Sequence, residues 1–155
     1  MNAQRLHSIT LTAIIFLASV TATASDISID MHRVDSGNFY VRALASGDIE
    51  TDLLLDTGSS YVSLSQNTFN KISAVSAPRF IRHIYGKLAN GKVEKVPLYA
   101  LNELKLAENC VLTNIEVAVF SRADRDILGL NALAKLQPFT MQLTPAKLTS
   151  AACAS

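Results

Sequence analysis

Apolar and polar side chains alternate along most of the chain after residue 26, which is the pattern of half-buried β-strands. Turn residues separate the alternating runs, as at residues 35–38 (Asp-Ser-Gly-Asn) and 46–48 (Ser-Gly-Asp). The pattern predicts strands at residues 27–31, 39–44, 49–55, 61–64, 81–88, 92–98, 99–106, 110–120, 126–129 and 139–143. We therefore expect an all-β fold, with residues 139–143 as its last strand.

Two segments show helical features instead. Ser65 is placed to cap a short helix over residues 66–72, because a serine hydroxyl accepts hydrogen bonds from the free N–H groups of a first helical turn. Apolar residues within 130–136 fit two helical turns, which Pro138 would stop. One or two short helices should accompany the sheet.

A β-hairpin is predicted around Ala89-Asn90-Gly91. The three residues separate two strand-like runs, 81–88 and 92–98, and Asn-Gly between such runs is the strongest short-range hairpin signal.

The third predicted strand ends on an acid. Its first half alternates with exposed acids, its end is apolar throughout, and Asp56 follows directly. Buried strands seldom end on a carboxylate unless a partner or a chemical task holds it there. Thr57, Gly58 and Ser59 come next, so the backbone can turn sharply beside several hydroxyl groups.

The N-terminal residues read as a targeting segment. Arg5 and His7 precede an apolar run at residues 11–20, and Ala22-Thr23-Ala24 follows. A basic start, a short apolar stretch and an A-x-A end describe a secretory signal peptide. We expect residues 1–24 to be removed after Ala24, leaving a secreted or periplasmic chain. An uncleaved N-terminal membrane anchor is the alternative, although the run is shorter than the roughly 20 residues of a membrane span.

The remaining residues, 25–155, fit one domain with a real core. Without Arg5 the chain carries 13 basic and 13 acidic residues. This balance leaves no overall basic field for nucleic acid and no polybasic signal for a membrane surface.

Cys110 and Cys153 are the two cysteines of the chain. In an oxidising compartment such a pair is expected to form a disulfide, which would fix a C-terminal tail that otherwise frays. Two free thiols or an intermolecular bridge are the alternatives. The cysteines and the scattered His32 and His83 lack the spacing of metal ligands, so we expect no metal site.

The order of these motifs resembles that of the retropepsin-like aspartic proteases, in the single-domain form found in bacterial envelopes. The resemblance extends over residues 39–143. It includes the apolar strand that runs into Asp-Thr-Gly-Ser-Ser, the hairpin with Ala-Asn-Gly at its tip, and Ile127-Leu128-Gly129 before a short helix. It implies a β-barrel with a flap hairpin, a peptide or protein substrate, and no cofactor.

The resemblance also assigns residues to roles. Asp56 would be the catalytic acid, Thr57 and Gly58 would complete the triplet, and Ala89-Asn90-Gly91 would form the flap tip. Gly129 would pack beside the catalytic loop. Ser59 stands where a hydroxyl could bond the outer oxygen of the carboxylate and favour its ionised form.

The implied chemistry needs two carboxylates. Placed about 3 Å apart they share one proton, so that one activates water while the other donates to the substrate carbonyl. The chain has one Asp-Thr-Gly. An enzyme would therefore be a homodimer with one Asp56 from each chain.

Other residues and functions were weighed against this interpretation. Asp126 is interpreted as structural, with a nearby arginine as its partner, and Tyr85 as a packing residue of the hairpin rather than a substrate contact. Residues 121–125 are interpreted as a solvated loop. The alternative function is a noncatalytic peptide- or protein-binding module on the same fold.

Overall fold

The computed structural model describes residues 26–88, 90–136 and 138–154. In chain order its elements are β1 (Ile27–Arg33), β2 (Phe39–Ala45), β3 (Ile49–Leu55), β4 (Val62–Ser65), α1 (Gln66–Val75), β5 (Arg79–Lys87), β6 (Val93–Ala107), β7 (Cys110–Phe120), β8 (Asp126–Leu128), α2 (Leu130–Leu133), a 3-10 turn (Ala134–Leu136), β9 (Phe139–Leu143) and β10 (Ala146–Ser150). The predicted signal peptide, residues 1–24, lies outside the described residues, and so does Ala89 at the predicted flap tip.

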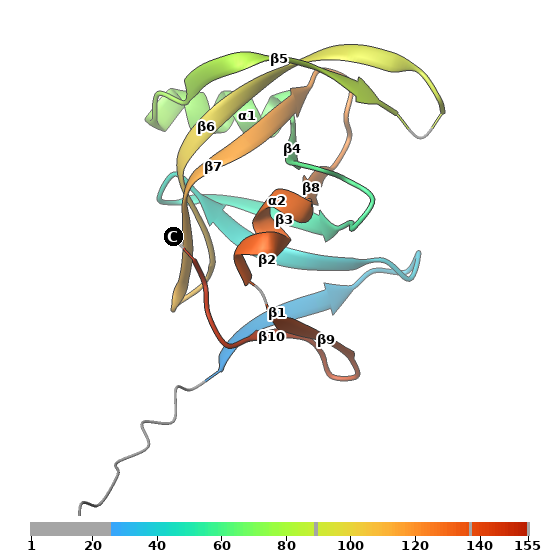
Figure 1. The fold of residues 1–155 in the computed structure, drawn as a ribbon, viewed down its shortest axis with the longest axis vertical. Helices are drawn as coiled ribbons and strands as arrows, with labels where there is room; N and C mark the ends of the chain where they lie inside the picture. The colour runs from blue at the N-terminus through green and yellow to red at the C-terminus, as the bar shows by residue number, and fades with distance from the viewer. Residues whose placement is uncertain (1–25, 89, 137, 155) are drawn as a thin grey trace, which may run out of the picture.

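The strands form a barrel. They follow the order β5-β6-β7-β4-β8-β3-β2-β1-β10-β9, and an additional pairing of β6 with β2 closes the six strands from β6 to β2 into a ring. Side chains from the inner faces of these strands pack with α1 and α2 into the main core, and a smaller cluster around Val96, Leu98 and Ala118 lies under the hairpin. The all-β fold, a barrel with a hairpin above it and short helices, is thereby confirmed (Figure 1).

Parallel pairings at the centre of the barrel set up the site. β3 runs parallel to β8, with Leu55 opposite Leu128, and β4 runs parallel to β7. Because β3 and β8 end side by side, the residues that follow them, Asp56 and Gly129, emerge at the same edge of the sheet.

The predicted hairpin is formed by β5 and β6, which arch over the barrel (Figure 1). β6 is one strand of 15 residues rather than the two predicted. Pro97 does not interrupt it, because the pairing of β6 with β7 begins at Leu98, so Pro97 has only β5 beside it.

Both helices are present. α1 begins after Ser65, whose hydroxyl accepts from the Thr68 N–H as predicted, and it extends to Val75. α2 and the following 3-10 turn cover the predicted residues 130–136.

The end of the fold differs from the prediction. Residues 139–143 are not the last strand, because β10 follows and lies between β1 and β9. Met141 and Leu143 of β9 are exposed, and Phe139 at the start of this edge strand packs against the core. Leu148 of β10 is fully buried in the core.

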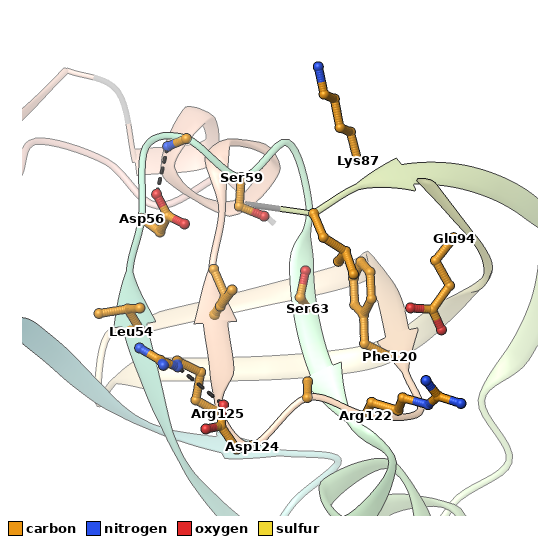
Figure 2. A pocket seen from close by; sticks show the side chains of 14 residues that line it. Leu54, Asp56, Ser59, Ser63, Lys87, Glu94, Phe120, Arg122, Asp124 and Arg125 are labelled. Carbon is orange, nitrogen blue, oxygen red and sulfur yellow. Dashed lines mark hydrogen bonds and ion pairs between the residues drawn. The ribbon is translucent and has the colours of Figure 1, made fainter. Parts of the chain in front are cut away.

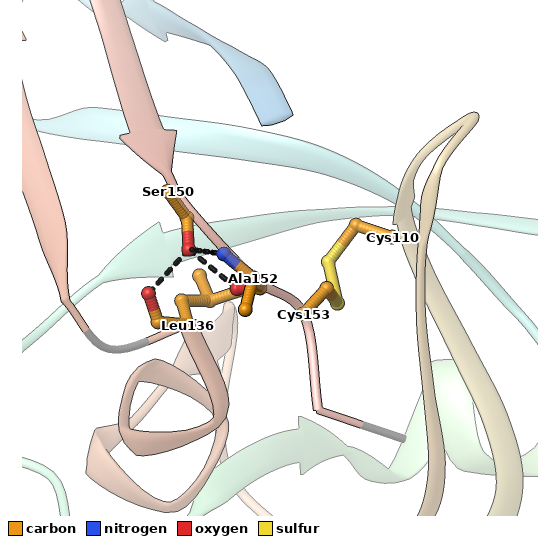
Figure 3. Close-up of a disulfide and its surroundings, with 5 residues drawn as sticks. All are labelled: Cys110, Leu136, Ser150, Ala152 and Cys153. Carbon is orange, nitrogen blue, oxygen red and sulfur yellow. Dashed lines mark hydrogen bonds between the residues drawn. A yellow bond between two sulfur atoms is a disulfide. The ribbon is translucent and has the colours of Figure 1, made fainter. Parts of the chain in front are cut away.

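A disulfide joins Cys110 to Cys153, with Cα atoms 5.4 Å apart (Figure 3). It attaches the C-terminal tail to the start of β7. The Ser150 hydroxyl donates to the Leu136 carbonyl, and the Ala154 N–H donates to the Lys135 carbonyl at 2.8 Å. The predicted intramolecular disulfide is therefore formed, and it is typical of chains that leave a reducing cytoplasm. Among the described residues no helix is long and apolar enough to cross a membrane.

Candidate active site

Asp56 sits where β3 leaves the barrel. Its N–H donates to the carbonyl of Leu128 at 3.2 Å, which continues the pairing of β3 with β8 by one residue. Its Oδ1 accepts from the Gly58 N–H at 2.8 Å, and the side chain is partly exposed (Figure 2). The sheet thus fixes the backbone of Asp56, and the turn that follows fixes one oxygen of its carboxylate.

Of the two residues after Asp56, Gly58 lies against the carboxylate and Thr57 faces solvent. An ideal Cβ on Gly58 would lie 3.1 Å from Asp56 Oδ1, so glycine allows the backbone N–H to approach the carboxylate. Thr57 is exposed, which leaves its hydroxyl open to solvent.

Ser59 does not form the bond predicted for it. Its hydroxyl donates to the carbonyl of Tyr61 at 2.8 Å instead of to the Asp56 carboxylate. A hydroxyl has one hydrogen to donate, and this bond uses it to hold the turn closed. Ser59 therefore shapes the loop rather than the charge of the acid.

Gly129 packs against the same loop, as predicted. A Cβ there would lie 2.2 Å from the carbonyl oxygen of Tyr61 and 2.9 Å from that of Ser59. The Leu130 N–H then donates to the Ser59 carbonyl at 2.8 Å. The acid loop and the start of α2 are in direct backbone contact, which no side chain at this position would permit.

Asn131 secures this contact, and sequence analysis missed it. Its Oδ1 accepts from the Val62 N–H at 2.7 Å, and its Nδ2 donates to the Glu116 carbonyl at 2.8 Å. The side chain thereby joins α2 to β4 and β7 beneath the loop. The one feature of the sequence that could have pointed to Asn131 is its position two residues after Gly129. An asparagine at that position is equally expected as an ordinary polar residue on the surface of a helix.

A cavity of about 690 Å³ opens beside Asp56 (Figure 2). It lies between the acid loop, the part of the hairpin next to its tip turn and the segment between β7 and β8. Its lining residues are Leu54, Asp56, Gly58, Ser59, Ser63, Lys87, Leu88, Glu94, Phe120, Arg122, Ala123, Asp124, Arg125 and Ile127. Residues 122–125, part of the segment predicted as a solvated loop, thus form one wall of the cavity.

The hairpin tip is a tight turn. The Leu88 N–H donates to the Lys92 carbonyl and the Gly91 N–H to the Leu88 carbonyl, each at 2.8 Å. Gly91 has φ +81°, a conformation that favours glycine, and the Asn90 side chain accepts from the Lys92 N–H. The predicted use of Asn-Gly as a turn signal is confirmed.

Tyr85 is not a packing residue. It is 76% exposed, which contradicts the predicted packing role. Its neighbour Gly86 faces Phe120 of the cavity wall, with 3.2 Å between an ideal Cβ and the ring. Since successive residues of a strand point to opposite faces, Tyr85 points away from the cavity.

Asp126 is structural, but its partners are not arginines. The side chain is 6% exposed and accepts hydrogen bonds from the hydroxyls of Thr51 and Thr68 and from the Ser65 N–H at 2.7 Å. Arg125, the nearest arginine in sequence, pairs with Asp124. Asp126 therefore joins β3, β8 and the start of α1.

Asp35-Ser36-Gly37 is a second acid-hydroxyl-glycine triplet of the chain. It forms the turn between β1 and β2, as predicted, with the Gly37 N–H donating to the Val34 carbonyl. Asp35 is not among the residues lining the cavity. Of the three carboxylates that line the cavity, Asp56, Glu94 and Asp124, it is Asp56 that belongs to an acid-hydroxyl-glycine turn and accepts from the N–H of its glycine.

No group of three or more histidine, cysteine or acidic side chains that could hold a metal ion occurs among residues 26–88, 90–136 and 138–154. What the described residues supply is a carboxylate in a glycine-held loop, an apolar floor and a hairpin above it.

Comparison with known proteins agrees with this arrangement. Residues 41–135, more than half of the chain, match the family described as "gag-polyprotein putative aspartyl protease". No curated protein matches the chain. Among solved structures, the chain is similar to a retropepsin-like aspartic protease from Rickettsia conorii, with a TM-score of 0.60 over 81% of this chain and 89% of that one. The two sequences are 21% identical, so the likeness shows a common fold.

Proposed function

Because the chain belongs to the retropepsin-like aspartic protease family, we propose that it is an endopeptidase that hydrolyses peptide bonds as a homodimer. The observation that supports this proposal best is the Asp56 loop. It keeps a carboxylate at the floor of a cavity, in a turn built by Gly58 and Gly129. A chain without catalysis would have little reason to retain that acid at the end of an apolar strand.

The second carboxylate would come from a second copy of the chain. Two Asp56 side chains about 3 Å apart would share one proton, because two like charges so close cannot both be ionised. The ionised carboxylate would take a proton from water as the water attacks the peptide carbonyl. The protonated one would donate to the carbonyl oxygen, and no cofactor is required.

The surrounding residues have supporting roles in this proposal. The Gly58 N–H holds one oxygen of Asp56 and leaves the other oxygen for water. Thr57, exposed in the single chain, would hydrogen-bond across the dimer and keep the two loops in register. The hairpin would close over an extended peptide, with Asn90 and Gly91 at its tip together with Ala89, and exclude water.

The test is cleavage of an unfolded protein by residues 25–155, measured against enzyme concentration, with Asp56→Asn beside it. We expect the rate to rise faster than linearly with concentration in the range where the dimer forms, and to be lost in Asp56→Asn. The variant keeps the side-chain shape, so its circular dichroism spectrum should match that of the parent and serve as the control.

A folded chain that cleaves nothing from acid to neutral pH would contradict the proposal. If that chain were also monomeric at high concentration, the noncatalytic peptide-binding module would be the better account. A rate strictly proportional to concentration down to the lowest measurable level, where a dimer would dissociate, would contradict the homodimer alone.

We also propose that residues 1–24 are a signal peptide and that the protein acts outside the cytoplasm. The Cys110–Cys153 disulfide supports this location, because such bonds persist in oxidising compartments. N-terminal sequencing of the exported protein should begin at residue 25; a chain that starts at Met1 would support the membrane-anchor alternative.

A further inference from the structure

The hairpin of β5 and β6 has a face on the side away from the cavity, which we call the outer face. Its residues form three cross-strand pairs: Lys87 with Val93, Tyr85 with Lys95, and His83 with Pro97. The intervening pair, Gly86 with Glu94, faces the cavity, and successive strand residues point to opposite faces. Although Lys87 borders the cavity, its side chain therefore points away from it (Figure 2).

The outer face is exposed and partly apolar. Tyr85 is 76% exposed and Val93 is 65% exposed, and both lie next to exposed lysines. The face continues toward the barrel with Phe80, which is 48% exposed and whose ring centroid lies 5.2 Å from that of His83. Large apolar side chains that are exposed together, rather than singly, mark an interaction surface.

The charges of the outer face have one sign. Lys87 and Lys95 lie on it, and Lys92 follows the tip turn beside it. The one acid of residues 79–99 is Glu94, which faces the cavity instead. Within the described part of the chain, no recorded ion pair involves any of these three lysines. The overall balance of acidic and basic residues therefore conceals a local cationic surface.

The chemistry of this face fits a lipid surface better than a protein or a nucleic acid. Lysine is depleted from the cores of protein interfaces. Arginine is the residue that best recognises nucleic-acid phosphates, yet both arginines of β5 lie on the other face, Arg79 opposite Ala100 and Arg82 opposite Leu98. Lysine and tyrosine instead suit a membrane boundary, because their polar ends reach the headgroups while the lysine stem and the ring cover apolar surface.

We propose that the outer face of the hairpin docks on a lipid bilayer that contains anionic phospholipids. Lys87 and Lys95 pair with lipid phosphates, while Tyr85 and Val93 enter the region between headgroups and acyl chains. Such binding is peripheral and needs no membrane-spanning segment. The cavity lies on the other side of the hairpin, so it stays open to solvent beside the membrane. The proposal does not depend on the peptidase function, because lipid binding is measured without a substrate.

Sedimentation with lipid vesicles tests the proposal. Residues 25–155 are used because they contain the whole described fold without the apolar run at residues 11–20, which could itself bind lipid. We expect the oxidised protein to sediment with vesicles of phosphatidylcholine and phosphatidylglycerol, and to stay in solution with phosphatidylcholine alone. High salt should weaken the binding, because salt screens exposed charges. Failure to bind the anionic vesicles at low salt would overturn the proposal.

Variants of the outer face separate its two contributions. Lys87→Gln, Lys95→Gln should lower the partition coefficient on anionic vesicles by about tenfold to thirtyfold, because two favourable charges are lost at the lipid surface. Tyr85→Ser, Val93→Ser should lower it by about threefold or more, because apolar area is lost. All four side chains are exposed, so the circular dichroism spectra should match that of the parent.

The matched control removes the same charge elsewhere. Arg122→Gln, Lys135→Gln changes one cation in the loop after β7 and one in the 3-10 turn after α2. Its partition coefficient should stay within about twofold of the parent, because charges more than a Debye length from the lipid are screened. An equal loss in this variant and in Lys87→Gln, Lys95→Gln would show that net charge alone drives binding, and the proposal would be wrong.

A tryptophan probe locates the contact. The chain contains no tryptophan, so Tyr85→Trp gives a single signal from the outer face. Its emission should shift to shorter wavelength on anionic vesicles and be quenched by lipids with brominated acyl chains. Met141→Trp is the control, since Met141 is exposed on β9 at the other end of the molecule (Figure 1), and its emission should not change. A shift at position 141 without one at position 85 would assign lipid binding to another surface.

Single-stranded nucleic acid is the other ligand that lysines beside aromatic rings could bind. A fluorescently labelled oligothymidylate is titrated with the parent and with Lys87→Gln, Lys95→Gln, at the salt concentration at which vesicles are tested. We expect no binding by either protein. Oligonucleotide binding that the lysine variant loses, in a protein that ignores anionic vesicles, would assign the outer face to nucleic acid and refute the proposal.

Discussion

At the scale of single residues, two aspartates on neighbouring strands have opposite surroundings. Asp126 is buried and its carboxylate accepts three hydrogen bonds from protein groups, whereas Asp56 is partly exposed and accepts one recorded bond from Gly58. A buried acid held by three donors is fixed in position. An acid with free acceptor positions beside a cavity is open to a ligand, and sequence position alone does not reveal this difference.

Asp126→Asn should destabilise the fold by about 1–3 kcal/mol, because the amide offers one acceptor oxygen to three donors. Urea denaturation followed by circular dichroism measures the loss. Asp124→Asn is the control, since Asp124 is exposed and bonded only to its neighbour Arg125, and it should change stability by less than about 0.5 kcal/mol. Equal effects of the two variants would contradict the structural role of Asp126.

Gly129→Ala should be among the most damaging small changes in the chain. The new Cβ would overlap the backbone at Tyr61, which cannot move without opening the acid loop, and we expect a cost of about 2–3 kcal/mol. Thermal unfolding with Gly86→Ala beside it measures the difference. At Gly86 the obstacle is the Phe120 side chain, which can shift, so that variant should lose about 1 kcal/mol or less. An unchanged melting temperature for Gly129→Ala would show that the acid loop can move to accommodate the new Cβ, and it would contradict this prediction.

At the scale of secondary structure, alternation predicted most strands because each has one face in the core. It placed β3 and β7 with their observed bounds, and it placed the hairpin because Asn90-Gly91 has a turn geometry of its own. The alternation also placed β9 at its observed bounds, although Phe139 is its one residue packed against the core. β10 was missed even though Leu148 and Ser150 are buried, because it follows directly after Thr144-Pro145, a dipeptide that reads as an interruption.

The candidate site was predictable in part for the same reason. Asp56, Gly58 and Gly129 belong to local motifs, and the structure brings them together at one sheet edge. The cavity walls come from segments distant in sequence, so their residues carried no local signal of a shared site. Ser59 was misassigned because a hydroxyl next to an acid has several possible acceptors, and the Tyr61 carbonyl is the one within reach.

At the scale of the whole molecule, the disulfide closes a segment of 43 residues that includes α2, β9 and β10. Replacing both Cys110 and Cys153 with serine should lower the free energy of unfolding by about 3–4 kcal/mol, on a chain-entropy estimate for a loop of this length. Guanidinium denaturation of the oxidised parent and the double variant measures the change. Reductant should weaken the parent and leave the double variant unaffected; sensitivity of both would point to a cause other than this bond.

The two ends of the described chain lie in the same sheet. β1, which begins at Ile27, pairs with β10, and Ile29 lies opposite Leu148. β1 is the first described strand to be synthesised, and it cannot pair with β10 until almost the whole chain has been made. This contact is among the most distant in sequence that the chain can make. If the protein is exported, β1 crosses the membrane before β10, one of its two partner strands, is available. Assembly of this sheet is then completed only after translocation has ended, so the finished fold first exists at the destination of the chain.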